Sequence, residues 1–239
     1  MALILCLETA TGVCSVALFR DNVLLGLKES STRNVHSSML TVFIEEVTRE
    51  SGISPGELDA IAVSMGPGSY TGLRIGVAAA KGLCYALDKP LVAIPTLQAM
   101  AAGMNDELKI KNFELFSEIP CLVCPMIDAR RMEVYCAVYD GKNREVEPVR
   151  PEIIDENSFG NLLARNRIVF GGEGAAKCKP DLETHPNALF IDGFASSARH
   201  MHTMAATKLS QSHFENLAYF EPFYLKDFVA GKPRIKGLI

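Results

Sequence analysis

The sequence lacks a surplus of basic residues, which limits what the chain binds by charge alone. Its 239 residues include 24 lysines and arginines against 28 aspartates and glutamates, giving a formal charge of −4. Because phosphate contacts need a concentrated basic face, we do not expect the isolated chain to bind nucleic acid tightly. This charge is still compatible with a share in a larger RNA-handling complex.

Long apolar runs are also absent, and none approaches the length of a membrane span. The short apolar run at residues 1–7 has no basic residues before it and ends at Glu8, so we predict a strand there and no signal peptide. The seven cysteines are odd in number and lack the spacing of a disulfide framework. Such cysteines are typical of reduced thiols, so the sequence predicts a cytoplasmic protein without a membrane anchor.

Motifs for metal binding and nucleophilic catalysis are scarce. None of the five histidines has another histidine four residues away, as two ligands on one helix face require. Cys121 and Cys124 form a C-x-x-C, but on a predicted strand they point to opposite faces, and no second pair completes a zinc site. No serine lies in the G-x-S-x-G context of a nucleophile elbow. We therefore predict neither a catalytic metal nor a serine triad.

The sequence does contain a regular series of strand and helix patterns. In the first half, apolar segments separated by turn residues, and apolar residues at helical spacing, give the order β-β-β-α-β-α-β-α. The predicted strands are 3–7, 13–19, 23–29, 60–65 and 91–94, and the predicted helices are 36–51, about 71–87 and about 96–103.

The second half repeats this order of elements without repeating the residues. Strands are predicted at 121–127, 134–139, 145–152, 168–170 and 188–191, and helices at 154–164, after the glycine turn 171–174, and at about 196–209. Eight elements in the same order predict a duplicated α/β fold of the actin-like ATPase type, with two ribonuclease-H-like domains. We assign residues 1–108 to the first domain and 109–212 to a second, less regular one. We expect residues 213–239 to return to the first domain.

The most distinctive stretch reads GPGSYTGLRIG, over residues 66–76, and follows a predicted strand. A strand, a glycine turn and a helix N-terminus together present N–H groups to an anion, with Gly66, Gly68 and Ser69 as candidate contacts. The spacing misses G-x-G-x-x-G, and no lysine follows as a P-loop requires. Alternatively, the glycines only allow close packing between the strand and its neighbours.

Two carboxylates lie in the turns after the first strand of each half. Glu8 stands beside Thr9, and Asp128 is followed closely by Arg130 and Arg131. In an actin-like fold these turns face the cleft, where two carboxylates can hold magnesium through water and one can act as a general base. One alternative is therefore a small-molecule phosphotransferase of the sugar-kinase type. The other is that each carboxylate serves its own turn through ion pairs and backbone donors.

The string at residues 66–76 is accompanied by further characteristic segments. These are residues 7–11, 14–18, 36–37, 95–97, 128–131 and 133–135. Together they resemble the TsaB (YeaZ) family of bacterial tRNA threonylcarbamoyladenosine biosynthesis proteins, closely in the N-terminal half and more loosely in the second.

The resemblance implies an actin-like fold and a non-catalytic role in making N6-threonylcarbamoyladenosine at position 37 of tRNAs that read codons beginning with A. It implies a TsaD-like catalytic partner, a TsaE-like ATPase, a TsaC-like protein that supplies threonylcarbamoyl-adenylate, and tRNA bound through the complex. ATP and magnesium would be used by the complex, and this chain's cleft would be vestigial. In TsaD an H-x-x-x-H motif holds the metal; the corresponding residues here are Thr96 and Met100, neither of which is a plausible ligand.

The helices at 37–50 and 72–87 carry apolar residues around more than one narrow stripe. Paired helices of this kind suit an isologous or pseudo-symmetric interface, and the resemblance implies that they form both a homodimer and the contact with the TsaD-like subunit. The predicted interface residues are Met39, Val42, Phe43, Leu73, Val77, Ala80 and Cys84. The alternative is that these residues belong to the core of their own domain.

Overall fold

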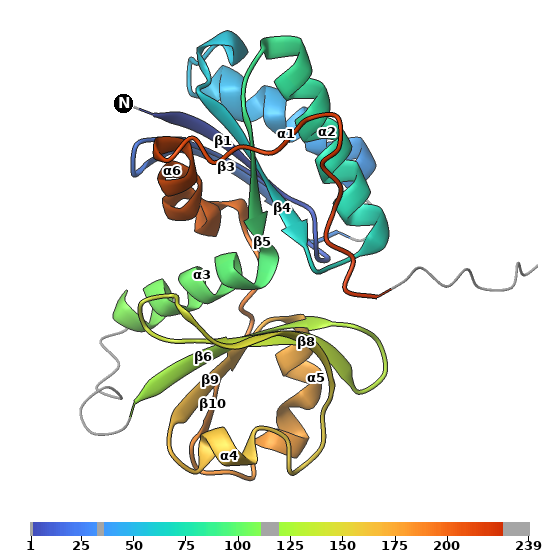
Figure 1. Ribbon diagram of the computed structural model, residues 1–239, viewed down its shortest axis with the longest axis vertical. Coiled ribbons are helices and arrows are strands. Elements are labelled where there is room, and N and C mark those ends of the chain that lie inside the picture. The colour runs from blue at the N-terminus through green and yellow to red at the C-terminus, as the bar shows by residue number, and fades with distance from the viewer. Residues whose placement is uncertain (1, 33–35, 111–119, 227–239) are drawn as a thin grey trace, which may run out of the picture.

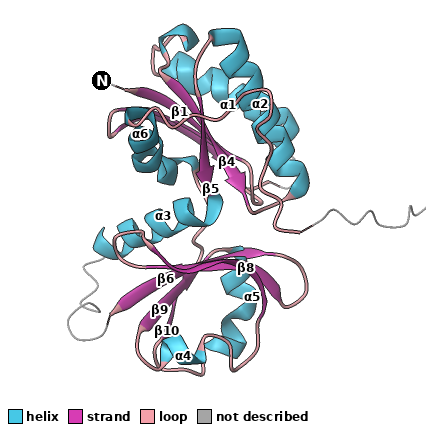
Figure 2. Ribbon diagram, in the orientation of Figure 1, coloured by secondary structure: helices cyan, strands magenta, loops and turns pink. Residues whose placement is uncertain are grey.

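The computed structural model describes residues 2–32, 36–110 and 120–226. Within these ranges the chain forms two lobes, each built on a five-stranded sheet (Figure 1, Figure 2). The first sheet has the order β3-β2-β1-β4-β5. Its strands are β1 (Leu3–Glu8), β2 (Cys14–Arg20), β3 (Val23–Ser30), β4 (Ala60–Gly66) and β5 (Leu91–Pro95).

The second sheet, β10-β9-β6-β7-β8, repeats the arrangement of the first. Its strands are β6 (Cys121–Asp128), β7 (Glu133–Tyr139), β8 (Glu145–Ile153), β9 (Arg167–Gly171) and β10 (Ala188–Ile191). In both sheets the first strand pairs antiparallel with the second and parallel with the fourth. The repeated order confirms the predicted duplicated α/β fold.

Strand β1 is apolar on both faces because helices cover both sides of its sheet. Leu5 and Leu7 face the helices α1 (His36–Glu50) and α2 (Tyr70–Leu87), whereas Ile4 and Cys6 face the opposite side. This division follows from the two-residue period of a strand. A strand covered on both faces reads as a continuous apolar run, as residues 3–7 do.

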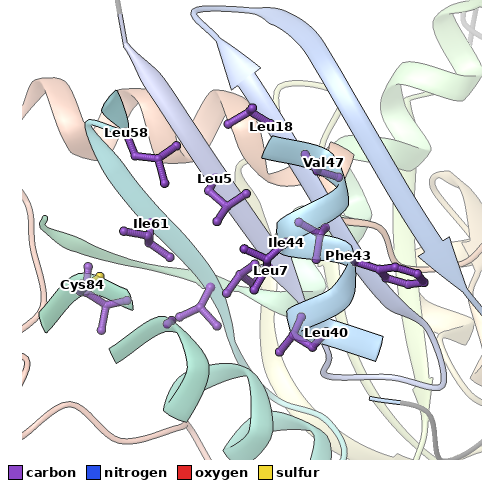
Figure 3. Close-up of a cluster of buried hydrophobic side chains, with 14 of the residues drawn as sticks. Leu5, Leu7, Leu18, Leu40, Phe43, Ile44, Val47, Leu58, Ile61 and Cys84 are labelled. Carbon is purple, nitrogen blue, oxygen red and sulfur yellow. The ribbon is translucent and has the colours of Figure 1, made fainter. Parts of the chain in front are cut away.

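Helix α1 packs against the first sheet through one apolar stripe (Figure 3). Leu40, Phe43, Ile44 and Val47 follow the i, i+3, i+4, i+7 spacing and are all buried. Each such side chain contributes about 1.5–3 kcal/mol when it is removed from water. The stripe therefore accounts for both the formation of this helix and its position.

The last helix of each half packs on the sheet of the other half. Helix α3 (Thr96–Ile110) follows β5, but its apolar side lies against β6 and β7 of the second sheet. The 3-10 helix η3 (Ala198–Met201) and helix α6 (His202–Ser210) follow β10, but they lie against the first sheet. Domain boundaries at residues 108 and 212 therefore separate the two halves of the sequence. They do not separate the two packed lobes, because each lobe contains a helix from the other half.

Two predicted helices differ from the structure. The helix predicted over 154–164 is wrong for most of its length, because only α4 (Gly160–Leu163) is helical. Asp155 instead accepts hydrogen bonds from the Asn157 amide and the Ser158 hydroxyl, which form a turn before α4. Helix α3 runs seven residues further than predicted. In the described part of the chain, no helix combines the length and the apolarity needed to cross a membrane.

Residues 213–226, which we call the strap, run along the first lobe beside α2 (Figure 1). The Glu215 amide donates to the Leu91 carbonyl (2.9 Å), and the Phe223 amide donates to the Met65 carbonyl (2.7 Å). The Lys81 ammonium donates to the Phe220 carbonyl (3.1 Å), and the Phe220 ring enters the core of the first lobe. The rest of the segment predicted to return to the first domain, 227–239, lies outside the described residues.

Candidate functional site

The glycine loop after β4 packs against the turn between β1 and β2. A Cβ atom on Gly68 would clash with the Ala10 carbonyl, and one on Gly72 would clash with the Thr9 carbonyl. The Ser69 amide donates to the Ala10 carbonyl (2.6 Å), and the Ser69 hydroxyl accepts from the Gly72 amide (3.3 Å) as the N-cap of α2. The chain's own carbonyl oxygens therefore occupy the side of the loop where an anion would need N–H donors. Of the two interpretations of this loop, the geometry favours close packing.

Thr9 fixes α2 to the β1–β2 turn. Its hydroxyl donates to the Gly72 carbonyl (2.8 Å), and a Cβ on Gly76 would clash with the same hydroxyl oxygen. Gly66 has a φ of +118°, which favours glycine, and faces the Phe223 carbonyl of the strap. The glycines thus serve to position the N-terminal half of α2.

Glu8 lies at the end of β1 with only 1% of its surface exposed. Its Oε1 accepts hydrogen bonds from the Ala10 amide (2.6 Å) and the Ser64 hydroxyl (3.1 Å). Burial raises the pKa of Glu8 from 4.5 to about 7, and these two hydrogen bonds oppose the rise only in part. A side chain in this setting stabilises its own turn and is poorly placed to hold a hydrated cation.

We expect Glu8→Gln to change how stability depends on pH. Because the pKa of Glu8 is higher in the folded chain than in the unfolded one, the free energy of unfolding should fall as pH rises from 4.5 to 7. Glutamine keeps an oxygen acceptor and carries no charge, so the variant should lose this slope and be more stable at pH 8 by about 2 kcal/mol. Urea unfolding at several pH values measures both effects. An unchanged pH slope in the variant would contradict the assignment.

Asp128, the second predicted cleft carboxylate, is paired within its own lobe. Its Oδ1 forms an ion pair with Lys177 of helix α5 (Glu173–Leu182) and accepts from the Arg130 amide (2.8 Å). Partial burial would raise the pKa of Asp128, but these contacts outweigh it and hold the pKa below its ordinary value. Glu8 and Asp128 thus serve separate turns, and no specific contact favours the phosphotransferase interpretation. Within the described ranges, no group of three or more His, Cys, Asp or Glu residues could hold a metal ion.

Thr96 and Met100, the residues at which the resemblance implies metal histidines in TsaD, both have structural roles here. The Thr96 hydroxyl accepts from the Gly66 amide (3.1 Å) at the start of α3. Met100 is buried among the side chains between α3 and the second sheet. The two positions are therefore occupied by groups that hold the loop and the core together.

Most of the predicted interface residues lie in the core of the first lobe. Phe43, Leu73, Val77, Ala80 and Cys84 are all less than 9% exposed, and all of them except Leu73 belong to the cluster between the two helices and the sheet. Their burial in this chain favours the alternative that they belong to the core of their own domain, because helical spacing alone does not distinguish the side that faces the sheet from the side next to it. Met39, which is partly buried, and Val42, which is 39% exposed, do reach the surface.

The exposed side of the α1–α2 pair includes residues that the interface prediction missed. Ile75, Ala79 and Leu83 recur every four residues along α2 and are only partly buried. Gly82 lies beside them, and a Cβ there would meet nothing within 4 Å. A glycine inside a helix costs about 1 kcal/mol relative to alanine, and no contact with the described residues explains this one. We refer to Met39, Val42, Ile75, Ala79, Gly82 and Leu83 as the helix-pair surface.

Comparison with known proteins places the chain in a family. A family model described as "TsaD: tRNA N6-adenosine threonylcarbamoyltransferase" matches residues 28–227. The "tRNA threonylcarbamoyladenosine biosynthesis protein TsaB" of Escherichia coli K12 is 30% identical over 238 residues, which cover 96% of each chain. The chain belongs to the TsaB family.

Other relatives agree with TsaB membership. The TsaB protein of Haemophilus influenzae is 29% identical over 96% of this chain and 95% of its own. The crystal structure of YeaZ from Pseudomonas aeruginosa superposes with a TM-score of 0.77 at 23% identity, over 94% of this chain and 100% of that one. The "tRNA N6-adenosine threonylcarbamoyltransferase" of Nitratidesulfovibrio vulgaris DP4 is 34% identical over 119 residues, which cover 43% of this chain and 33% of that protein. The enzyme is thus matched over only a part of its length.

Proposed function

We propose that this TsaB chain is a non-catalytic scaffold subunit in threonylcarbamoyladenosine synthesis. It would dock on a TsaD-type catalytic subunit that transfers the threonylcarbamoyl group to adenosine 37 of tRNAs reading codons beginning with A. The pathway in this proposal is the one that the names of its relatives state, tRNA threonylcarbamoyladenosine biosynthesis. The observation that supports the scaffold role is the engagement of Thr96 and Met100 in structural contacts, at the two residues where the resemblance implies metal histidines in the catalytic subunit.

The helix-pair surface is the proposed docking site for the TsaD-type subunit. It combines the exposed Val42 with partly buried apolar side chains on α2. Beside them lies Gly82, where an added Cβ would meet no atom within 4 Å. Small residues along a helix allow the backbone of a second helix to approach closely. Because TsaD-type proteins share this fold, a matching helix pair on the partner would give a pseudo-symmetric contact. A second copy of this chain would use the same surface for a homodimer when the partner is absent.

The remaining components act through the complex. We infer that a TsaE-type ATPase uses ATP and magnesium there, and that this chain does not hold the nucleotide itself. The paired state of Glu8 and Asp128 supports that division. A cytoplasmic location is supported by the seven cysteines, all of which are free thiols and six of which are buried.

Val42→Asp should separate docking from folding. Val42 is exposed enough to accept a charge without loss of the core, so the variant should fold but bind the TsaD-type subunit at least about tenfold more weakly. The matched control is Val23→Asp, which introduces the same charge in the same lobe at a residue that is 63% exposed at the start of β3. Isothermal titration with the TsaD-type subunit of the same organism measures both. Equal affinities for the two variants would contradict docking through the helix pair.

A further inference from the structure

The hairpin between β6 and β7 carries two adjacent arginines whose guanidinium groups extend away from the contacts of their own turn. Arg130 and Arg131 are both exposed, and among the described residues neither guanidinium forms a hydrogen bond or an ion pair. Both have left-handed backbone conformations, with φ values of 73° and 53°. Residues other than glycine, asparagine and aspartate adopt this region at a cost of about 1–2 kcal/mol each. The fold gives no reason for arginine at two such positions.

The neighbouring carboxylates are already neutralised by other cations. Asp128 is paired with Lys177, and Glu133 is paired with Lys226 at the end of the strap. The Lys177 ammonium also donates to the Glu133 carbonyl (2.6 Å). Arg130 acts on Asp128 through its charge, but among the described residues neither Arg130 nor Arg131 has a carboxylate in direct ion-pair contact.

A continuous series of contacts joins this hairpin to the first turn of α2. Two residues before Lys226, the Tyr224 ring lies 4.9 Å from the Tyr70 ring. The Arg74 Nη1 donates to the Tyr70 hydroxyl (2.7 Å), and its guanidinium lies 5.3 Å from the centre of the Tyr70 ring. In Figure 1 the strap ends beside the N-terminal end of α2 and above the hairpin that follows β6.

A groove of about 500 Å³ lies between α2 and the strap on this side. Its walls include Tyr70, Arg74, Lys81 and Tyr224, together with one carboxylate, Glu221. Within the described chain, Arg74, like the two hairpin arginines, forms no ion pair with a carboxylate. We call Tyr70, Arg74, Arg130, Arg131, Tyr224 and Lys226 the basic mouth, because the contacts described above lead from the first turn of α2 through the end of the strap to the β6–β7 hairpin.

We propose that the basic mouth binds the phosphodiester backbone of tRNA directly. Guanidinium groups match the geometry of phosphate oxygens, and the exposed Tyr224 ring offers a stacking face to a base that is not paired. The chain has a net charge of −4, but this surface is locally basic. It contains three arginines that, among the described residues, form no ion pair with a carboxylate. The choice of tRNA as the polyanion rests on the proposed function. The helix-pair surface is composed of other residues, so the catalytic subunit and tRNA need not compete for the same side chains.

The net negative charge also sets the expected strength of this contact. A few phosphate contacts on an acidic chain give weak binding that depends strongly on salt concentration. The contact would therefore orient a tRNA held mainly by the complex.

The test is tRNA binding to the full-length chain alone, followed by fluorescence anisotropy of labelled tRNA between about 50 and 200 mM salt. The double variant Arg130→Glu/Arg131→Glu should bind about tenfold more weakly, and the slope of log affinity against log salt should fall by about two. The neutral double variant Arg130→Gln/Arg131→Gln should lie between it and the wild type. The matched control is the double variant Arg20→Glu/Arg165→Glu, an equal charge change at two exposed arginines, one at the end of β2 and one just after α4, and it should bind nearly as the wild type does.

Three outcomes would overturn the proposal. One is the absence of salt-dependent tRNA binding by the wild-type chain, and another is an equal loss of binding in the Arg20/Arg165 control. The third is intact tRNA binding by the double variant together with lost binding of the TsaD-type subunit, which would make the mouth a protein contact. Because the assay contains no partner protein, a failure of docking through the helix pair would leave its result unchanged.

Discussion

Replacing Gly72 with alanine should lower the thermal midpoint of the chain by about 10 °C. The added Cβ would clash with the Thr9 carbonyl, which belongs to the backbone and cannot rotate away. Either the first turn of α2 or the β1–β2 turn must then shift, and overpacking of this kind costs about 3 kcal/mol. For a protein of this size, each kcal/mol corresponds to about 2–4 °C.

The matched control for Gly72→Ala is Gly82→Ala on the same helix. Gly82 is exposed and a Cβ there meets nothing, so alanine should stabilise the helix by about 1 kcal/mol and raise the midpoint by about 3 °C. Differential scanning calorimetry of the two variants measures whether each substitution lowers or raises the thermal midpoint. If Gly72→Ala were neutral, the loop would have free space on that side, and the anion-site interpretation would regain support.

The two sheets could be predicted because their signals are local. Residues 3–7 are apolar without interruption, and the structure explains this by helices on both faces of β1. The exchange of α3 and α6 between the lobes could not be predicted in the same way. A helical pattern such as Leu97, Met100, Ala101, Met104 and Leu108 identifies an apolar side, but it contains no information about which sheet that side will cover.

The glycine loop illustrates a second limit of sequence reasoning. Its composition fits an anion site and a close packing contact equally well, because both need a backbone that no side chain obstructs. What distinguishes them is the position of Thr9 and Ala10, about sixty residues earlier, whose carbonyls fill the loop. Contacts between segments so far apart in the sequence are not encoded in the motif itself.

The cleft residues show a related limit. The sequence predicts Glu8 and Asp128 in the turns after the first strand of each half, whereas in the structure each is the last residue of that strand. The sequence left open whether the two carboxylates act together. Burial of Glu8 and the ion pair of Asp128 with Lys177 show that each carboxylate serves its own turn. Lys177 is 49 residues from Asp128, and only the packing of α5 against β6 brings the two together.

Omitting this chain from a reconstituted reaction should abolish tRNA modification. On the proposed scaffold role, the catalytic subunit would then lack the partner that orders it, and in the described part of this chain Thr96 and Met100 are taken up by structural contacts. For the same reason, the chain without its TsaD-type partner should transfer no threonylcarbamoyl group. Val42→Asp should restore the reaction poorly, and Val23→Asp should restore it fully.

The most direct measurement is the threonylcarbamoyladenosine content of tRNA, determined by mass spectrometry after reaction with TsaC-, TsaD- and TsaE-type proteins, ATP and magnesium. The scaffold role predicts modification with this chain present and only background without it. Modification that is undiminished in its absence would contradict that role. So would modification by this chain when the TsaD-type subunit is left out.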